Sequence, residues 1–296
     1  MTHPLLDRLV SRRLIVVTGK GGVGKSTLAA VITAGLAARG LRALAVEVDP
    51  RENLHQLFGV APSGGEVVPA GPRRAILHLK PRAVIDRVVV ERVRLGPLVR
   101  RVQASPIYQH FVESAPGLES LAVLEFGRRL AGEAGHDVVV LDAPASGHGL
   151  SLLLAPKVTA EAVGTGGPVG RLAAELSEFV ADAERLGVVV VTQPEEMPVT
   201  EALEFQAELL ARVHREPDGV VVNGVYPPWV EQEAARLPAA IADLWHERDR
   251  LGGRELARLV AAWPPSSGAV VTLPLLARGR GPELVAALAA SWEGSA

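Results

Sequence analysis

Two lysines and a hydroxyl side chain stand in a glycine-rich stretch, residues 19–27, that reads Gly-Lys-Gly-Gly-Val-Gly-Lys-Ser-Thr. The fixed positions of the pattern G-x-x-x-x-G-K-[ST] are filled by Gly19, Gly24, Lys25 and Ser26. In this pattern the backbone N–H groups surround phosphate oxygens, the lysine neutralises the β- and γ-phosphates, and the hydroxyl binds Mg²⁺. The sequence therefore predicts a site for ATP and Mg²⁺. The other loop residues expected to contact the nucleotide are Gly21, Gly22, Val23 and Thr27.

The segments on either side of this loop favour a phosphate site. Residues 14–17, Leu-Ile-Val-Val, form an apolar run typical of a buried strand. Residues 27–39 place their apolar side chains on one helical stripe, and Gly40 follows where a helix commonly ends. A strand, a glycine loop and a helix N-terminus together direct N–H groups toward phosphate. A glycine-rich turn that binds no ligand is the alternative.

A second lysine in the loop narrows the prediction. The chain holds only four lysines, two of them in this loop, which indicates that a compact ammonium group is needed there. The run Gly-Lys-Gly-Gly-Val-Gly-Lys-Ser resembles the "deviant" P-loop of the ArsA, MinD and ParA ATPases. This resemblance implies that Lys20 reaches across a dimer interface to the partner's nucleotide. The alternative is a solvated lysine at a loop tip.

Acidic side chains end two further predicted strands. Residues 41–48 and 137–142 are apolar runs typical of buried strands; Asp49 follows the first run and Asp142 closes the second. Because the carboxyl ends of parallel strands share one edge of a sheet, we expect both carboxylates beside the glycine loop. An aspartate at the end of such a strand commonly contacts the Mg²⁺ of a P-loop through water, which is the role predicted for Asp142.

Three further segments resemble parts of ArsA-type ATPases. Residues 49–58 resemble switch I, which implies that Asp49 orients the attacking water; the alternative is that Asp49 caps a turn before a proline. Residues 142–150, Asp-Ala-Pro-Ala-Ser-Gly-His-Gly-Leu, resemble switch II, which implies that Gly147 senses the γ-phosphate. The resemblance also implies that Asn223, at the end of a fifth predicted strand, hydrogen-bonds the adenine. A turn-forming asparagine is the alternative.

The alternation of strands and helices predicts the fold. Short apolar runs separated by helical patterns indicate an α/β fold with a doubly wound, mostly parallel sheet. The resemblance makes this a P-loop NTPase of the SIMIBI type. We expect one ATPase domain over residues 1–296, with helical subdomain insertions at 81–133 and about 150–185. Within the second insertion, the glycines of residues 159–170 predict a flexible loop.

Composition excludes several kinds of site. The chain has no cysteine, so disulfides, thiolate zinc sites and cysteine-ligated iron–sulfur clusters are excluded. Coupling to arsenite through cysteines, and the Cys-x-x-Cys zinc clamp of the family's eukaryotic targeting relatives, are excluded with them. The formal net charge of −2 gives no global attraction for nucleic acid. Without a signal peptide or an apolar run long enough to span a membrane, the chain is expected to be cytoplasmic.

These observations predict an Mg²⁺-dependent ATPase whose nucleotide state switches a dimer and a surface for a protein client. A ParA- or MinD-like positioning protein that binds DNA or membrane is a second hypothesis. The segment 281–296 contains no lysine or arginine, which argues against membrane binding of the MinD kind. A nucleotide-gated partner in a heterodimer with a paralogue is a third. The identity of the client is open. Promiscuous hydrophobic grooves are commonly rich in methionine, whose flexible side chain adapts to different partners, and this chain has only two methionines.

Overall fold

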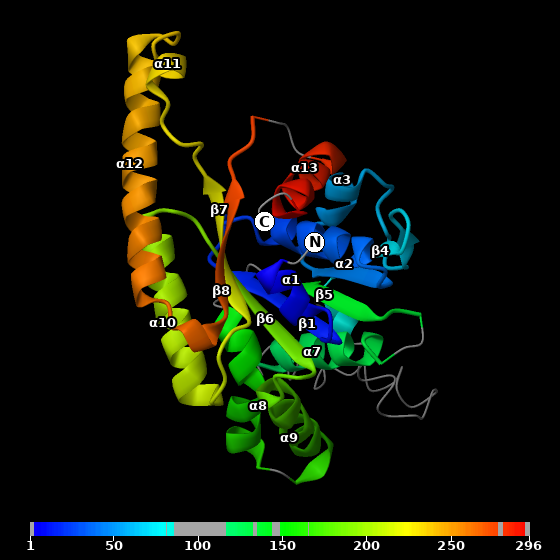
Figure 1. Ribbon diagram of the computed structural model, residues 1–296. Coiled ribbons are helices and arrows are strands. Elements are labelled where there is room, and N and C mark those ends of the chain that lie inside the picture. The colour runs from blue at the N-terminus through cyan, green and yellow to red at the C-terminus, as the bar shows by residue number, and fades with distance from the viewer. Residues whose placement is uncertain are drawn as a thin grey trace.

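The structure is a computed structural model, and it describes residues 3–80, 82–85, 117–132, 135–143, 149–164, 166–277 and 281–293. Its centre is an eight-stranded sheet with the strand order β3-β4-β2-β5-β1-β6-β7-β8 (Figure 1). All neighbouring strands run parallel except β3, which pairs antiparallel with β4 at the edge. The strands are β1 (Leu14–Gly19), β2 (Ala43–Val48), β3 (Val68–Pro69), β4 (Arg74–Leu79), β5 (Val138–Asp142), β6 (Leu186–Thr192), β7 (Gly219–Val225) and β8 (Ala269–Pro274).

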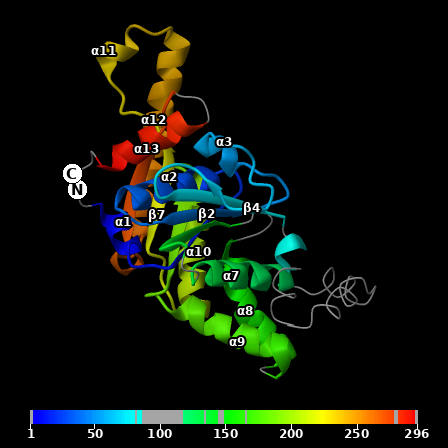
Figure 2. The same cartoon turned by 90° about the vertical axis from the view of Figure 1, so that its right-hand side faces the viewer.

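Helices cover both faces of the sheet (Figure 2). One face packs against α1 (Pro4–Leu9), α2 (Lys25–Ala38), α3 (Leu54–Phe58) and α13 (Pro282–Glu293). The other packs against α7 (Leu118–Leu130), α8 (Gly149–Val163), α9 (Gly167–Ala181), α10 (Glu196–Val213) and α12 (Ala239–Ala262). The short helices α11 (Glu231–Ala234) and η1 (Pro265–Ser267) lie in connections. This arrangement confirms the predicted doubly wound α/β fold.

The central strands are apolar on both sides because both faces are covered. In β1, Leu14 and Val16 belong to the core beneath α7, α8 and α9, whereas Ile15 and Val17 belong to the core beneath α2. Alternate side chains of a strand point to opposite faces, so a strand covered twice must be apolar throughout. The continuous apolar runs that predicted buried parallel strands have this cause.

The two ends of the chain lie close together on one face of the molecule (Figures 1 and 2). His3 caps α1 by accepting the backbone N–H of Leu6 at Nδ1 (3.3 Å), and its ring stacks on Trp292 of α13 with centroids 4.6 Å apart. Burial lowers the pKa of His3, with a smaller contribution of the same sign from Arg39. Two helices far apart in sequence are therefore joined by one neutral imidazole.

One helix pair extends beyond the sheet. The amino-terminal half of α12, with α11 beside it, projects past the ends of β7 and β8 (Figure 1). At its base α12 packs on α10 through the buried Leu259 and Trp263. Toward its tip Ile241 and Leu244 are exposed, and the rings of Trp229 and Trp245 pack edge to face.

The structure corrects one expectation and leaves another open. The loop predicted at residues 159–170 is wrong, because α8 continues to Val163 and α9 begins at Gly167. Apolar side chains on α8 and α9 pack into the core and hold these glycine-containing segments helical. The division into subdomain insertions stays a prediction, since residues 86–116 lie outside the described residues. No helix in the described ranges is long and apolar enough to cross a membrane.

Candidate functional site

The glycine loop connects the carboxyl end of β1 to the first residue of α2, as the sequence predicted. Gly24 lies directly before α2 with φ +98°, a left-handed conformation that glycine adopts without strain. A Cβ at Gly24 would lie 2.2 Å from Nδ2 of Asn223, so the side chain of Asn223 fills the space that glycine leaves. Around Gly21 and Gly22 a Cβ would meet nothing within 4 Å, which leaves the outer side of the loop open to a ligand.

Lys25 lies over this loop. Its Nζ donates to the carbonyl oxygens of Lys20 (2.9 Å) and Gly19 (3.2 Å). Burial lowers the pKa of Lys25, while the nearby carboxylates of Asp142 and Asp49 raise it. The ammonium group is thus bound to carbonyl dipoles that phosphate oxygens could replace.

Ser26 and Asp142 form the second part of the site. Ser26 Oγ donates to Asp142 Oδ2 at 2.5 Å, whereas Asp142 Oδ1 is buried and has no hydrogen-bond partner among the residues that the structure describes. Burial raises the pKa of Asp142 to about 7, and the charges of Glu47 and Asp49 act in the same direction. A buried carboxylate oxygen without a donor, beside a serine hydroxyl, fits the hard oxygen ligands that Mg²⁺ prefers. These residues therefore fit the predicted cation.

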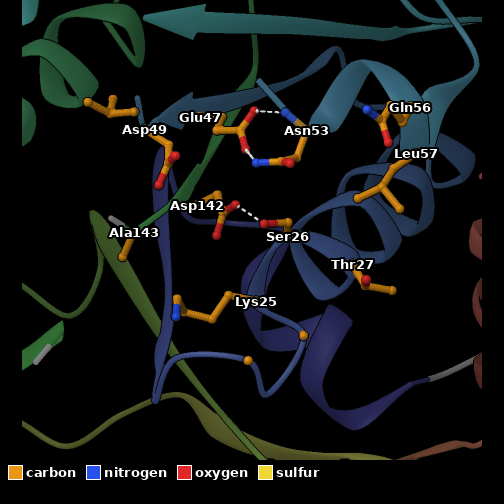
Figure 3. A pocket seen from close by; sticks show the side chains of 13 residues that line it. Lys25, Ser26, Thr27, Glu47, Asp49, Asn53, Gln56, Leu57, Asp142 and Ala143 are labelled. Carbon is orange, nitrogen blue, oxygen red and sulfur yellow. Dashed lines mark hydrogen bonds between the residues drawn. The ribbon is translucent and has the colours of Figure 1, made fainter. Parts of the chain in front are cut away.

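These side chains line a cavity of about 290 Å³ at the carboxyl ends of β1, β2 and β5 (Figure 3). Lys25, Ser26 and Asp142 lie together in it, and Asp49 lines the same space from the end of β2. Thr27 of α2 also lines the cavity. Strand-end aspartates predicted from sequence to meet at the loop do so, because β2, β5 and β1 are consecutive in the sheet.

Glu47 is a site residue that the sequence analysis missed. It lies within β2 and is 1% exposed. Its Oε2 accepts the backbone N–H groups of Asn53 (2.8 Å) and Leu54 (3.2 Å), and its Oε1 accepts the Asn53 side-chain amide (2.9 Å) (Figure 3). These bonds tie the start of α3 to the strand that leads into Asp49. The sequence did contain a sign of this role, because Glu47 is the one charged residue in the otherwise apolar strand Ala-Leu-Ala-Val-Glu-Val.

His78 of β4 holds the segment that carries Asp49. Its Nε2 lies 2.8 Å from the carbonyl oxygen of Asp49; because a carbonyl only accepts, Nε2 carries the proton. The Nδ1 of His78 lies 3.6 Å from Glu52 Oε2, and the other oxygen of Glu52 accepts the backbone N–H of Ser63. Sequence reasoning missed this contact because β4 and residues 49–52 are brought together by sheet pairing.

Lys20 points away from the cavity. Its Nζ forms an ion pair with Glu201 Oε1 of α10 at 2.7 Å, and both side chains are about two-fifths exposed (40% and 36%). Lys20 does not line the nucleotide cavity. The two lysines of the loop therefore have different environments: Lys25 faces the cavity and Lys20 faces outward.

Of the remaining predicted site residues, Asn223 lies beside the glycine loop, and Gly147 lies outside the described residues. Asn223 lies in β7, which continues to Val225, and its Nδ2 donates to the carbonyl oxygen of Val23 at 2.8 Å. Asn223 thus braces the glycine loop, and its contact with adenine stays a prediction. Gly147 lies outside the described residues, which resume at Gly149. A Cβ at Gly149 would lie 1.3 Å from Oγ1 of Thr18, so α8 can start against β1 only with glycine there.

Comparison with known proteins agrees with this geometry. A family described as anion-transporting ATPase matches residues 12–165, which include the glycine loop, Asp49 and Asp142. The chain belongs to the ArsA ATPase family. It is 30% identical to the ATPase BagA of Mycobacterium tuberculosis over 238 residues, covering 77% of this chain and 69% of that protein.

Other relatives are larger proteins. The chain is 29% identical to an arsenical pump-driving ATPase of Escherichia coli, over 76% of this chain and 36% of that protein. A relative in Halobacterium salinarum is likewise 29% identical, over 73% of this chain and 36% of its own length. The chain thus spans about a third of the length of these two relatives. Its membership identifies it as an ATP hydrolase.

Proposed function

We propose that this ArsA-family ATPase hydrolyses ATP with Mg²⁺ in a sandwich of two chains, and that nucleotide binding closes the sandwich. The observation that supports this most directly is the outward position of Lys20, 2.7 Å from Glu201 and outside its own phosphate cavity. A lysine that does not line the cavity of its own chain, and that an exposed ion pair holds, could leave Glu201 and reach the phosphates of a partner. The resemblance of the loop to the deviant P-loops, which implies that role for Lys20, also supports the proposal.

Within one chain the phosphates would replace carbonyl partners of Lys25. Its Nζ would leave the oxygens of Gly19 and Lys20 for the β- and γ-phosphates, while the loop N–H groups donate to phosphate oxygens. Ser26 and Asp142 would hold Mg²⁺, Asp142 through water. When bound, the cation supplies positive charge at the phosphates. Catalysis in such sites comes mostly from positioning and fixed charges.

Asp49 would orient the attacking water by accepting one of its protons in a hydrogen bond. Its place on the cavity wall, and the bond from His78 to its carbonyl oxygen, support this role. In a closed dimer the partner's Lys20 would add charge at the phosphates from the opposite side. Intrinsic turnover of the single chain should accordingly be slow.

The dimer switch would control a surface for a protein partner. The apolar side chains exposed on the projecting pair α11–α12, among them Ile241 and Leu244, support this part of the proposal. Exposed apolar groups close together on one projecting element mark interaction sites more often than isolated ones do.

Light scattering of the purified chain tests the proposal. Wild type should be a monomer without nucleotide and a dimer with ATP·Mg²⁺ or a transition-state mimic, whereas Lys20→Ala should stay monomeric. Lys157→Ala, which removes a lysine outside the loop, is the matched control and should dimerise like wild type. A wild-type chain that stays monomeric at saturating nucleotide would overturn the homodimer and favour a partner subunit.

A further inference from the structure

A second cavity, about 460 Å³ in volume, lies at the edge of the sheet opposite the glycine loop. Three of its arginines directly precede central strands: Arg13 before β1, Arg42 before β2 and Arg185 before β6. A fourth, Arg128, comes from α7. Because parallel strands begin at one common edge, the topology gathers these guanidinium groups from four segments of the chain.

Two of the four arginines are held by carboxylates. Asp137 accepts the Nε (3.2 Å), the Nη2 (2.7 Å) and the backbone N–H (2.7 Å) of Arg42. These bonds keep the pKa of Asp137 well below its ordinary value, so it stays charged. Arg128 donates to both oxygens of Glu125, which is fully buried and also accepts from Arg129. Asp137 and Glu125, two described acidic residues next to the cavity, are thus already engaged.

The other two arginines are held less closely by the described carboxylates: the charge of Arg13 acts on Asp137, and Arg185 has a long ion pair with Asp182. The side chain of Arg13 makes no hydrogen bond or ion pair with any other residue that the structure describes. Arg185 approaches Asp182 only to 4.0 Å, and its guanidinium lies over the ring of Phe179 at 4.9 Å. The two are neighbours, since the backbone N–H of Arg13 donates to the carbonyl oxygen of Arg185 (3.0 Å). Both arginines therefore line the cavity, and neither is held by a described carboxylate through short hydrogen bonds of the kind that hold Arg42 and Arg128.

We propose that this cavity binds a small organic phosphate through Arg13 and Arg185, with Arg42 and Arg128 completing the wall. Guanidinium groups match the oxygens of phosphate in paired hydrogen bonds. The volume lies in the range of small-molecule sites and exceeds what one phosphate group needs. The buried ring of Phe179 supplies an apolar wall for the organic part.

The distribution of charge supports a specific site. The whole chain carries a formal net charge of −2, so four arginines and one aspartate on a single cavity wall depart from the rest of the protein. β1 and β2 run from this cavity to the nucleotide site, one strand length away, so the two sites do not share residues. The proposal is independent of the dimer and of ATP hydrolysis.

Calorimetric titration with inorganic pyrophosphate tests the site. The titration uses the Lys25→Ala chain without Mg²⁺, because that substitution weakens phosphate binding at the glycine loop. Arg13→Gln with Arg185→Gln, added to this chain, removes the two available guanidinium groups. Arg248→Gln with Arg250→Gln removes the same charge on α12, away from the cavity, and is the matched control. Each double arginine substitution is also made in a chain that keeps Lys25. Normal ATP turnover by these two variants shows that they fold.

The proposal expects pyrophosphate binding in the Lys25→Ala chain that weakens at least about ten-fold in the cavity pair. The α12 pair should change the affinity less than about three-fold, the effect of a small change in net charge. Equal losses in both pairs, an unchanged affinity in the cavity pair, or no binding at millimolar pyrophosphate would each overturn the site.

Discussion

Single side chains set the shape of the nucleotide site before any ligand arrives. Asn223 fills the space above Gly24, Lys25 lies on carbonyl oxygens, and Ser26 is bound to Asp142. Each contact is polar and lies within a few ångströms of the loop. Single substitutions in this region should therefore distinguish two kinds of residue. Those that shape the loop should affect stability, and those that take part in the reaction should affect kcat.

Gly24→Ala should destabilise the protein without nucleotide by about 1–3 kcal/mol. The added methyl would lie 2.2 Å from Asn223 Nδ2, and the φ of +98° is strained for alanine. Gly21→Ala is the matched control, since its methyl meets nothing within 4 Å. Urea unfolding of both variants checks this. Equal stability of the two would show that the close approach of Asn223 does not constrain Gly24.

His78→Ala should lower kcat about ten-fold, which corresponds to ~1.4 kcal/mol, and leave KM nearly unchanged. The substitution removes the N–H that holds the carbonyl oxygen of Asp49, and so loosens a residue proposed to position water. His78→Gln can place an N–H near the same point and should recover most of kcat. A higher KM with normal kcat, or glutamine no better than alanine, would contradict a positioning role.

At the scale of elements, side-chain contacts join segments that are far apart in the sequence. α1 is joined to α13 through His3 and Trp292, and α10 reaches the glycine loop through Glu201 and Lys20. Neither contact is visible in local sequence patterns. The first contact is aromatic and buried, the second is an exposed ion pair, and each can be tested by a change of pH or by a single substitution.

The stability of the protein should fall as the pH drops through the ordinary histidine pKa of 6.5, partly because of His3. Burial lowers the folded-state pKa of His3, so the unfolded chain binds the proton first and protonation favours unfolding. His3→Asn keeps a capping side chain but does not titrate. Between pH 7.5 and 5.5, wild type should lose roughly 1–2 °C more in Tm than the variant. Parallel curves for the two proteins would contradict this.

Glu201→Gln should promote dimer formation. Lys20 must leave Glu201 to reach a partner, and an exposed ion pair of this kind contributes less than about 1 kcal/mol. The protein concentration at half-dimerisation in ATP should therefore fall about two- to five-fold. Glu204→Gln, one turn along α10, is the matched control and should have no effect. If the two variants behave alike, the pair with Lys20 does not oppose the dimer.

Much of this molecule could be predicted from its sequence, because the central strands and the glycine loop follow local rules. Apolar runs predicted the buried strands, and the strand-end positions of Asp49 and Asp142 predicted their meeting at the loop. Glu47, His78 and Glu201 could not be placed in this way, since their partners come from sheet pairing or from another helix. The predicted loop at residues 159–170 was wrong because packing of α8 and α9 on the core outweighed the preference of glycine for loops.

At the scale of the whole molecule, the sheet carries two sets of charged residues at opposite edges. The nucleotide site occupies the carboxyl ends of its central strands, and the arginine cavity occupies their amino ends. Ligands of parallel α/β sheets bind at the carboxyl ends of the strands, and the glycine loop lies at such an end here. Lys20, which pairs with Glu201 and does not line the nucleotide cavity, is the residue on which the proposed dimer depends.

The most direct test of this account is the rate of ATP hydrolysis per chain as a function of protein concentration, for wild type and Lys20→Ala. If two chains form the active site, the rate per chain should rise with concentration and level off once the dimer is complete. Lys20→Ala should remain slow at every concentration, while Lys157→Ala follows wild type. A rate per chain that does not change with concentration, and that Lys20→Ala leaves intact, would contradict the nucleotide sandwich.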